Sequence, residues 1–280
     1  MHVRFGNGNP AEGSVELTLV VVGAATGFVV GMTSTGGGAL LTPALVLLAD
    51  VPARVAIGSD VLIASTMKLA SGGFYAWRAE VHWPTVLRLL AGSAPGALAG
   101  LAVVNRLPIE SSETILRAGL GVVLVLAGAA IAFRLRSQAI PAATSFPAPL
   151  ATAAIGFIVG LLVSLTSIGS GSLLLCALGL WFPLGARTTV GTDLLHALAL
   201  SALVSAGHWS GGRVDPAVVG AVLVGAVPGS LAGAMAATAV PQRALRVVLA
   251  TVLVAIGVQL TASSVTALST ATSAPLEVAR

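Results

Sequence analysis

The chain is a succession of ten apolar segments joined by short polar stretches, and this pattern limits its fold more than any other feature of its 280 residues. Segments such as "VELTLVVVGAATGFVVGM" and "AGLGVVLVLAGAAIAF" approach the length of about 20 apolar residues that crosses a bilayer. Only 9% of the residues are charged, whereas soluble domains contain about 25%. The sequence therefore predicts an all-α polytopic membrane protein.

The second half of the chain repeats the first. Three blocks recur in the same order at an offset of 133 residues, and a fourth recurs at 129, which predicts a four-residue insertion in the second half. The matching pairs are "TSTGGGALL" (33–41) with "TSIGSGSLL" (166–174), "ARVAIGSDVL" (53–62) with "ARTTVGTDLL" (186–195), "GSAPGALAG" (92–100) with "GAVPGSLAG" (225–233), and "GFVVG" (27–31) with "GFIVG" (156–160).

The repeat predicts the domain organisation. The expected parts are an N-terminal tail (1–14), repeat 1 (15–133), a polar linker loop with three prolines (134–149), repeat 2 (150–263) and a C-terminal tail (264–280). The first residues lack the basic region and short apolar core of a signal peptide, so the first apolar run is expected to remain as a membrane segment. Five apolar segments are expected in each half, at 15–34, 37–49, 58–77, 84–104 and 113–133, and at 150–167, 170–183, 190–209, 216–238 and 243–263.

The second segment of each half is too short to cross a bilayer comfortably. With the first segment it forms either a broken, re-entrant hairpin or two full crossings, and both return the chain to its starting side. Three further crossings follow in each half, so the two repeats should have inverted orientations. The arginines of the connecting stretches divide almost evenly between the two sides, which fits this arrangement.

Glycine-rich breaks precede both short segments, and we expect them to bind an anion. Glycine permits backbone geometry that other residues resist, and a restarting helix offers unpaired N–H groups and a positive dipole end. Interrupted segments at matching places in inverted repeats indicate a transporter binding site. The alternative is close helix packing by small residues. The candidate ligands are Ser34, Thr35, Gly36, Gly37 and Gly38 in the first break, and Ser167, Gly169, Ser170 and Gly171 in the second.

Ionisable residues also occur inside the third segment of each half. Asp60 and Asp193 occupy equivalent positions, either as helix N-caps or as proton-coupling residues. Lys68 lies two turns after Asp60, where it either complements the anion or reaches towards an interface. His196 follows Asp193 by one turn, and it is expected to relay protons or to make a hydrogen bond within the bundle. Arg54 is predicted to be an interfacial anchor or part of the anion path, as is its equivalent Arg187.

These blocks resemble the TauE/SafE family of sulfite exporters and related anion permeases, formerly a domain of unknown function. The resemblance runs from about residue 20 to about residue 255 and rests on the two glycine-rich breaks and the "GSD" and "GTD" blocks. It implies a substrate such as sulfite, thiosulfate or an organosulfonate. The second break, "TSIGSG", lacks one glycine of "TSTGGG", so the two breaks need not bind equally.

The sequence thus predicts a secondary transporter of a small anion, possessing no catalytic residues, in the inner membrane of a bacterium. Proton coupling and a uniport mechanism are both open, and the alternatives are an anion channel or a membrane enzyme that uses Asp193 and His196. The single cysteine and the scattered His and acidic residues predict neither a metal nor another cofactor. The expected partners are the anion and the lipid bilayer, with a homodimer as an open alternative and no nucleic acid.

Overall fold

The computed structural model describes residues 10–33, 38–77, 81–136, 145–169, 171, 173–236 and 242–273. Every regular element within these residues is an α-helix, as predicted. The helices are α1 (Pro10–Thr33), α2 (Gly38–Leu48), α3 (Ala53–Trp77), α4 (Trp83–Arg106), α5 (Ile109–Arg136), α6 (Pro149–Thr166), α7 (Leu173–Trp181), α8 (Ala186–Ser210), α9 (Pro216–Ala236) and α10 (Gln242–Ser273).

The helix lengths confirm a polytopic membrane protein. In the described part of the chain, six helices are long and apolar enough to cross a bilayer, namely α4, α5, α6, α8, α9 and α10. Helices α2 and α7 have 11 and 9 residues and therefore extend about 16 and 14 Å, half of a hydrocarbon core. Neither short helix can form a full crossing by itself, which favours the broken hairpin over two crossings. Helix α10 runs to Ser273, past the segment end predicted at residue 263.

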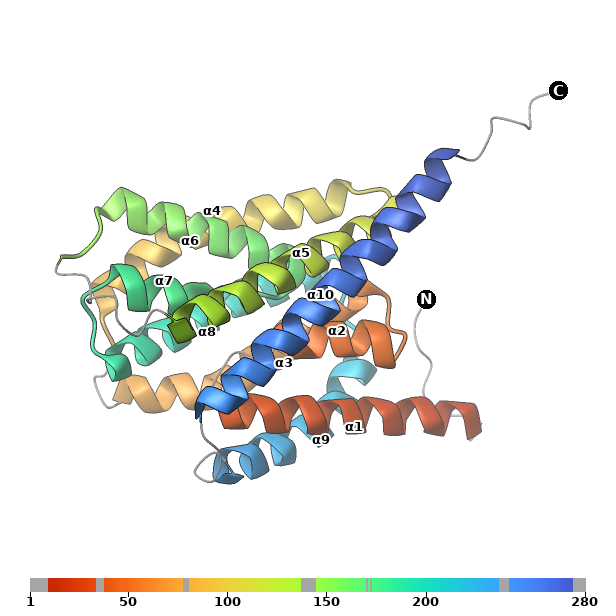
Figure 1. The fold of residues 1–280 in the computed structure, drawn as a ribbon, viewed down its shortest axis with the longest axis horizontal. Helices are drawn as coiled ribbons and strands as arrows, with labels where there is room; N and C mark the ends of the chain where they lie inside the picture. The colour runs from red at the N-terminus through yellow and green to blue at the C-terminus, as the bar shows by residue number, and fades with distance from the viewer. Residues whose placement is uncertain are drawn as a thin grey trace.

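Helices from different halves pack in pairs. Helix α1 lies along α9, α4 lies along α6, α5 crosses α10, and α3 packs against α8. Figure 1 shows α1 and α9 along the bottom, α4 and α6 along the top, and α5 and α10 running diagonally across the face. If each helix is replaced by its equivalent in the other half, the pair of α1 with α9 becomes the pair of α6 with α4. The pairs of α5 with α10 and of α3 with α8 stay the same. The opposite orientation of the halves across the membrane remains a prediction.

Glycines on α1 and α6 set the register of two of these pairs. A Cβ atom at Gly23 would collide with the backbone carbonyl of Val222, and one at Gly156 would collide with that of Leu89. Further equivalent collisions occur at Gly27 with Ala226 and Gly160 with Ser93, at Gly225 with Val20 and Gly92 with Ala153, and at Gly229 with Ala24 and Gly96 with Phe157. All these pairs are related by 133 residues. The predicted four-residue insertion is therefore wrong, because Gly156 matches Gly23 rather than Gly27.

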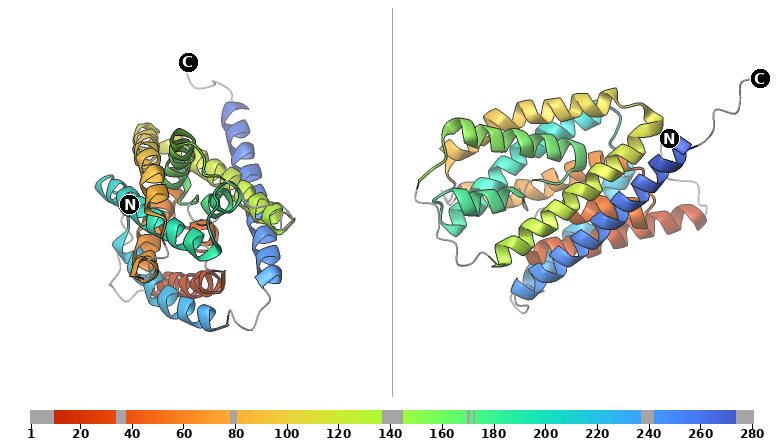
Figure 2. Two further views of the ribbon diagram at one scale, coloured as in Figure 1. Left: turned by 90° about the vertical axis from the view of Figure 1, so that its left-hand side faces the viewer. Right: turned by 45° about the horizontal axis from the view of Figure 1, so that its top comes forward.

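Two hydrophobic cores surround the centre of the molecule. The larger joins α1, α2, α3, α5, α9 and α10, and the smaller joins α4, α6, α7 and α8. Figure 2 shows α5 and α10 side by side on the outside of the molecule. Helix α3 contributes to both cores, through Ile57 and Ile63 in the larger core and Val61 in the smaller one. The ionisable residues of α3 therefore lie between the two cores.

Candidate functional site

The second glycine-rich break separates α6 from α7 as predicted. Helix α6 ends at Thr166, and the next residue, Ser167, is left-handed with a φ of 62° and donates its N–H to the Val163 carbonyl at 2.8 Å. Gly169 and Gly171 then adopt φ values of 147° and 93°, which side chains strongly disfavour. The backbone at this break therefore requires glycine at positions 169 and 171. That the break binds an anion remains a prediction.

Several predicted ligands lie outside the described residues. These are Ser34, Thr35, Gly36 and Gly37 of the first break and Ser170 of the second. Gly38 is the first residue of α2. The geometry of the candidate site is therefore built from the second break and from α3 and α8.

The carboxylates of Asp60 and Asp193 hold the two short helices. The Thr42 hydroxyl at the start of α2 donates to Oδ2 of Asp60. The backbone N–H of Gly171 in the second break donates to Oδ1 of Asp193 at 3.3 Å. Helix α3 therefore holds α2, and α8 holds the break before α7. The Gly171 N–H, which was expected to face an anion, already donates to Asp193.

The alternative of Asp60 and Asp193 as helix N-caps is wrong. Helix α3 begins at Ala53 and α8 begins at Ala186, so both carboxylates lie about two turns inside their helices and are buried. Burying an ionisable side chain in mid-membrane is costly and is associated with function. Their depth therefore strengthens the prediction that they take part in transport.

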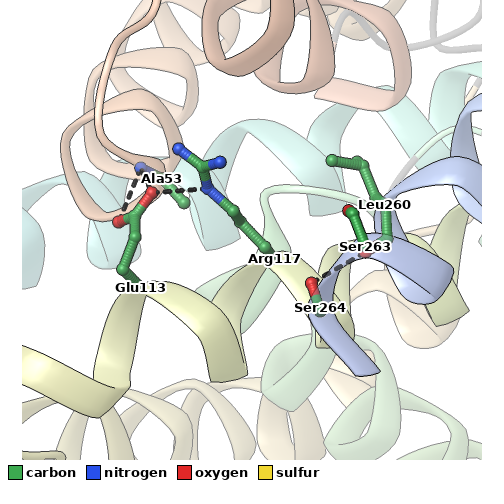
Figure 3. A network of polar contacts seen from close by, with 6 residues as sticks. All are labelled: Ala53, Glu113, Arg117, Leu260, Ser263 and Ser264. Carbon is green, nitrogen blue, oxygen red and sulfur yellow. Dashed lines mark hydrogen bonds and ion pairs between the residues drawn. The ribbon is translucent and has the colours of Figure 1, made fainter. Parts of the chain in front are cut away.

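The residue that caps α3 comes from another helix. Both carboxylate oxygens of Glu113, on α5, accept from the Ala53 N–H at 2.8 and 2.9 Å. Arg117 donates to the same carboxylate at 2.8 Å, as Figure 3 shows. The sequence analysis missed this cap because Glu113 is 60 residues from Ala53 along the chain.

Lys68 lies with both carboxylates rather than at an interface. Its side chain is only 8% exposed, and its ammonium interacts electrostatically with Asp193 and Asp60. The imidazole of His196 is also within electrostatic reach of Lys68. All four side chains are buried, and Asp60, Asp193 and His196 each lie within electrostatic reach of Lys68; we call these four residues the central cluster.

Buried polar atoms without a described partner adjoin the central cluster. The Ser167 hydroxyl faces the Asp60 carboxylate, and neither Ser167 Oγ nor Asp60 Oδ1 has any other partner among the described residues. His196 Nε2 meets the Ser93 hydroxyl at 2.9 Å, whereas Nδ1 has no described partner. An unpaired buried polar atom costs about 1–3 kcal/mol, so these atoms indicate a ligand or water.

The hydroxyl residues of the "GSD" and "GTD" blocks join the two halves. The backbone N–H of Asp215, at the start of α9, donates to the Ser59 hydroxyl at 3.1 Å. The backbone N–H of His82, at the start of α4, donates to the Thr192 hydroxyl at 3.0 Å. These bonds are again related by 133 residues. Sequence analysis identified the blocks but missed this structural role, which anchors the central cluster to α4 and α9.

The described residues include no set of three His, Cys, Asp or Glu side chains arranged to hold a metal ion. In the described structure, the lone Cys176 is buried, and its thiol lies 3.3 Å from the Ala130 carbonyl. The central cluster and the second break together offer hydroxyl, N–H, ammonium and carboxylate groups, a set suited to binding an oxyanion and protons.

Comparison with known proteins identifies the family. The family described as "Sulfite exporter TauE/SafE" matches residues 19–260. A probable membrane transporter protein of Bacillus subtilis, YjnA, is 32% identical over 88% of this chain and all of the relative. A second from that organism, YunE, is 27% identical over 86% of this chain and 96% of the relative. No solved structure matches the chain. The chain therefore belongs to the sulfite exporter TauE/SafE family, and it is a membrane transporter rather than an enzyme.

Proposed function

We propose that this protein transports a small sulfur oxyanion or organosulfonate, which binds between the second glycine-rich break and the central cluster. The observation that carries the proposal is that the buried Lys68 ammonium interacts electrostatically with the buried Asp60 and Asp193 carboxylates, next to the Ser167 hydroxyl that faces Asp60. Charged side chains inside a membrane segment usually mark a substrate or proton path. The family description supports sulfite as a candidate substrate.

The charges of the central cluster support coupling to protons. Two ionised carboxylates and one ammonium sum to −1, which repels an anion entering the cluster. A proton on one carboxylate brings the sum to zero. If Asp193 takes that proton, the Gly171 N–H is released to the anion because a neutral carboxyl is the weaker acceptor. Each anion therefore enters with at least one proton.

The duplicated architecture supports alternating access around this site. The helix pairs and the Ser59 and Thr192 hydrogen bonds are each related by the exchange of halves. In transporters of inverted repeats, the substrate lies where the halves meet, and one part rocks against the other. We infer that the halves are inverted and that the protein operates in the cell membrane of a bacterium, the source of its relatives.

Flux in proteoliposomes tests the proposed function. The purified protein should take up sulfite or sulfoacetate saturably, and an inward proton gradient should accelerate uptake. Lys68→Met should abolish uptake, whereas Ser230→Ala, an exposed control on α9, should leave it unchanged. Conductance without saturation would identify a channel, and an unchanged flux in Lys68→Met would remove the central cluster from the mechanism.

A further inference from the structure

Two arginines converge on one end of α4, and Arg54 lies six residues before Asp60 of the central cluster on α3. Arg54, in the first turn of α3, donates through Nη2 to the Val104 and Leu107 carbonyls at 2.9 and 3.4 Å. Arg213, between α8 and α9, donates through Nη1 to Oδ1 of Asn105 at 2.6 Å. The two guanidinium groups are within electrostatic reach of each other.

The local backbone brings these arginines together. Gly58 lies one turn after Arg54 on α3, and a Cβ atom there would collide with the Arg213 carbonyl. The absence of a side chain at Gly58 therefore lets the connection between α8 and α9 lie directly against α3. Arg213 is buried, whereas Asn105 is exposed, so the arginine pair lies close to water.

His208 fixes Arg213 without neutralising it. The Ser164 carbonyl can only accept, so His208 Nε2 donates to it at 3.0 Å. His208 Nδ1 accepts from Arg213 Nε at 2.9 Å, which makes the imidazole neutral. Arg213 Nη2 donates to the Gly207 carbonyl at 3.0 Å. Three nitrogens thus hold this guanidinium against neutral oxygen and nitrogen atoms.

The arginine pair lacks a described negative partner. No carboxylate of the described residues forms an ion pair with Arg54 or Arg213, whereas Arg117 pairs with Glu113. Arg54 Nε is buried and has no hydrogen-bond partner within that part of the chain. Two adjacent like charges repel, and an unused buried donor is costly. Both the repulsion between the arginines and the unused Nε donor of Arg54 favour the binding of an anion here.

We propose that Arg54 and Arg213 form a second anion-binding site, where a small oxyanion waits before or after crossing the membrane. Guanidinium groups bind the paired oxygens of such anions through parallel N–H donors. A buried polar face of α8 leads from this site to the central cluster, through His208, Ser205, Ser201, His196 and Asp193. From His208 to Asp193 this face extends about 22 Å, whereas Asp60 lies about 9 Å along α3 from Arg54. The role as a waiting site rests on the proposed transport function, whereas anion binding does not.

Equilibrium binding of ³⁵S-sulfate and ³⁵S-sulfite to the purified full-length protein tests this site. The unmodified protein should bind a second anion per chain, and Arg54→Gln should lose that second anion only. Arg54→Lys retains the positive charge and should recover much of the binding. Arg88→Gln removes an exposed arginine at the opposite end of α4 and should bind like the unmodified protein. Unchanged stoichiometry in Arg54→Gln would overturn the proposal and leave Arg54 as a cap of α4.

Lys68→Met separates this proposal from the proposed function. If the central site is real, Lys68→Met should lose one anion and the double variant with Arg54→Gln should lose both. If Lys68→Met binds normally while Arg54→Gln loses one anion, the arginine site stands and the central site fails. Nanodiscs with and without anionic lipid provide a further arm. Loss of the second anion only in anionic nanodiscs would assign the arginines to lipid headgroups and overturn the role in transport.

Discussion

Helices α3 and α8 are equivalent in the duplicated chain and pack against each other, yet they supply different chemistry to the central cluster. Both carry an aspartate at the same depth, Asp60 and Asp193, and each aspartate holds the short helix of its own half. Only α3 adds a cation, because Lys68 corresponds to Ser201 in α8. The two halves therefore share the positions of the aspartates, whereas the difference between Lys68 and Ser201 determines the charge of the site.

The same comparison distinguishes the two helices at other positions. His196 of α8 corresponds to Ile63 of α3, which lies in the larger hydrophobic core. Helix α3 has a capping side chain in Glu113, whereas Gly185 at the start of α8 gives no side-chain cap. In the proposed site, an anion would contact Lys68 on the α3 side and His196 on the α8 side, so the two sides should bind it differently.

Moving the cation from one helix to the other tests this comparison most strongly. Lys68→Met leaves two buried carboxylates without their ammonium, and breaking a buried charge pair costs about 3–5 kcal/mol. Sulfite uptake in proteoliposomes should therefore fall about 100-fold or more. The double variant Lys68→Ser with Ser201→Lys places the cation at the equivalent position of α8 and should recover part of the flux.

Thr66→Ala is the matched control, because it removes an exposed hydroxyl of α3, two residues from Lys68, that donates to its own helix at the Leu62 carbonyl at 3.0 Å. It should change uptake by less than about twofold, as does the loss of a local bond. A Lys68→Met protein that transports as well as this control would contradict the role of the cation.

Replacing the aspartates tests whether both halves handle protons. A gradient of one pH unit supplies about 1.4 kcal/mol per proton, enough for a tenfold accumulation of an anion that moves with one proton. Asp60→Asn and Asp193→Asn keep the acceptor oxygen for Thr42 and Gly171 but cannot take up a proton. The variant that loses this accumulation identifies the carboxylate that carries the proton. If both variants still accumulate the anion, neither aspartate of the central cluster carries the proton.

Glycine substitutions test the duplicated packing. Gly27→Val and Gly160→Val each push a side chain into a facing carbonyl, of Ala226 and Ser93 respectively. Overpacking costs about 1–3 kcal/mol, so both variants should lower the melting temperature in detergent by similar amounts. Gly220→Val is the control, because nothing lies within 4 Å of a Cβ atom there. A large effect in only one of the two variants would show that the helix pairs are not equivalent.

The smallest expected effect concerns the cap of α3. Glu113→Gln weakens the bonds to the Ala53 N–H and should cost about 1 kcal/mol. Hydrogen exchange should become faster at the first turn of α3 and stay unchanged at the first turn of α8. Equal acceleration at both helices would mean that Glu113 stabilises the whole bundle rather than one helix end.

The sequence was sufficient to predict the ten helices because apolar runs of membrane length and a short second segment are local properties. It misplaced one block by four residues, since small residues recur every fourth position in α1 and α6 and the comparison moved by one such step. Only the facing carbonyls of α4 and α9 reveal the correct register. Contacts between distant helices determine that register, and the sequence of one chain does not display them.

In the candidate site too, local sequence patterns were recognised, whereas contacts between distant residues were missed. The sequence pointed to Asp60, Asp193, Lys68 and His196 because ionisable residues are rare in apolar segments. It favoured capping as an alternative for the aspartates because Gly-Ser-Asp is a local cap pattern, whereas the helix start depends on the distant Glu113. Arg213 was missed because a loop arginine beside a membrane helix has the same local pattern as an interfacial anchor.

Proton movement during anion uptake tests the central claim most directly. Proteoliposomes held at zero membrane potential and loaded with a pH-sensitive dye should receive an outside pulse of sulfoacetate, whose sulfonate does not titrate near neutral pH. We predict that the interior acidifies as the anion enters, and that Lys68→Met abolishes both signals. Uptake of the anion without acidification would contradict proton coupling, and normal uptake in Lys68→Met would contradict binding at the central cluster.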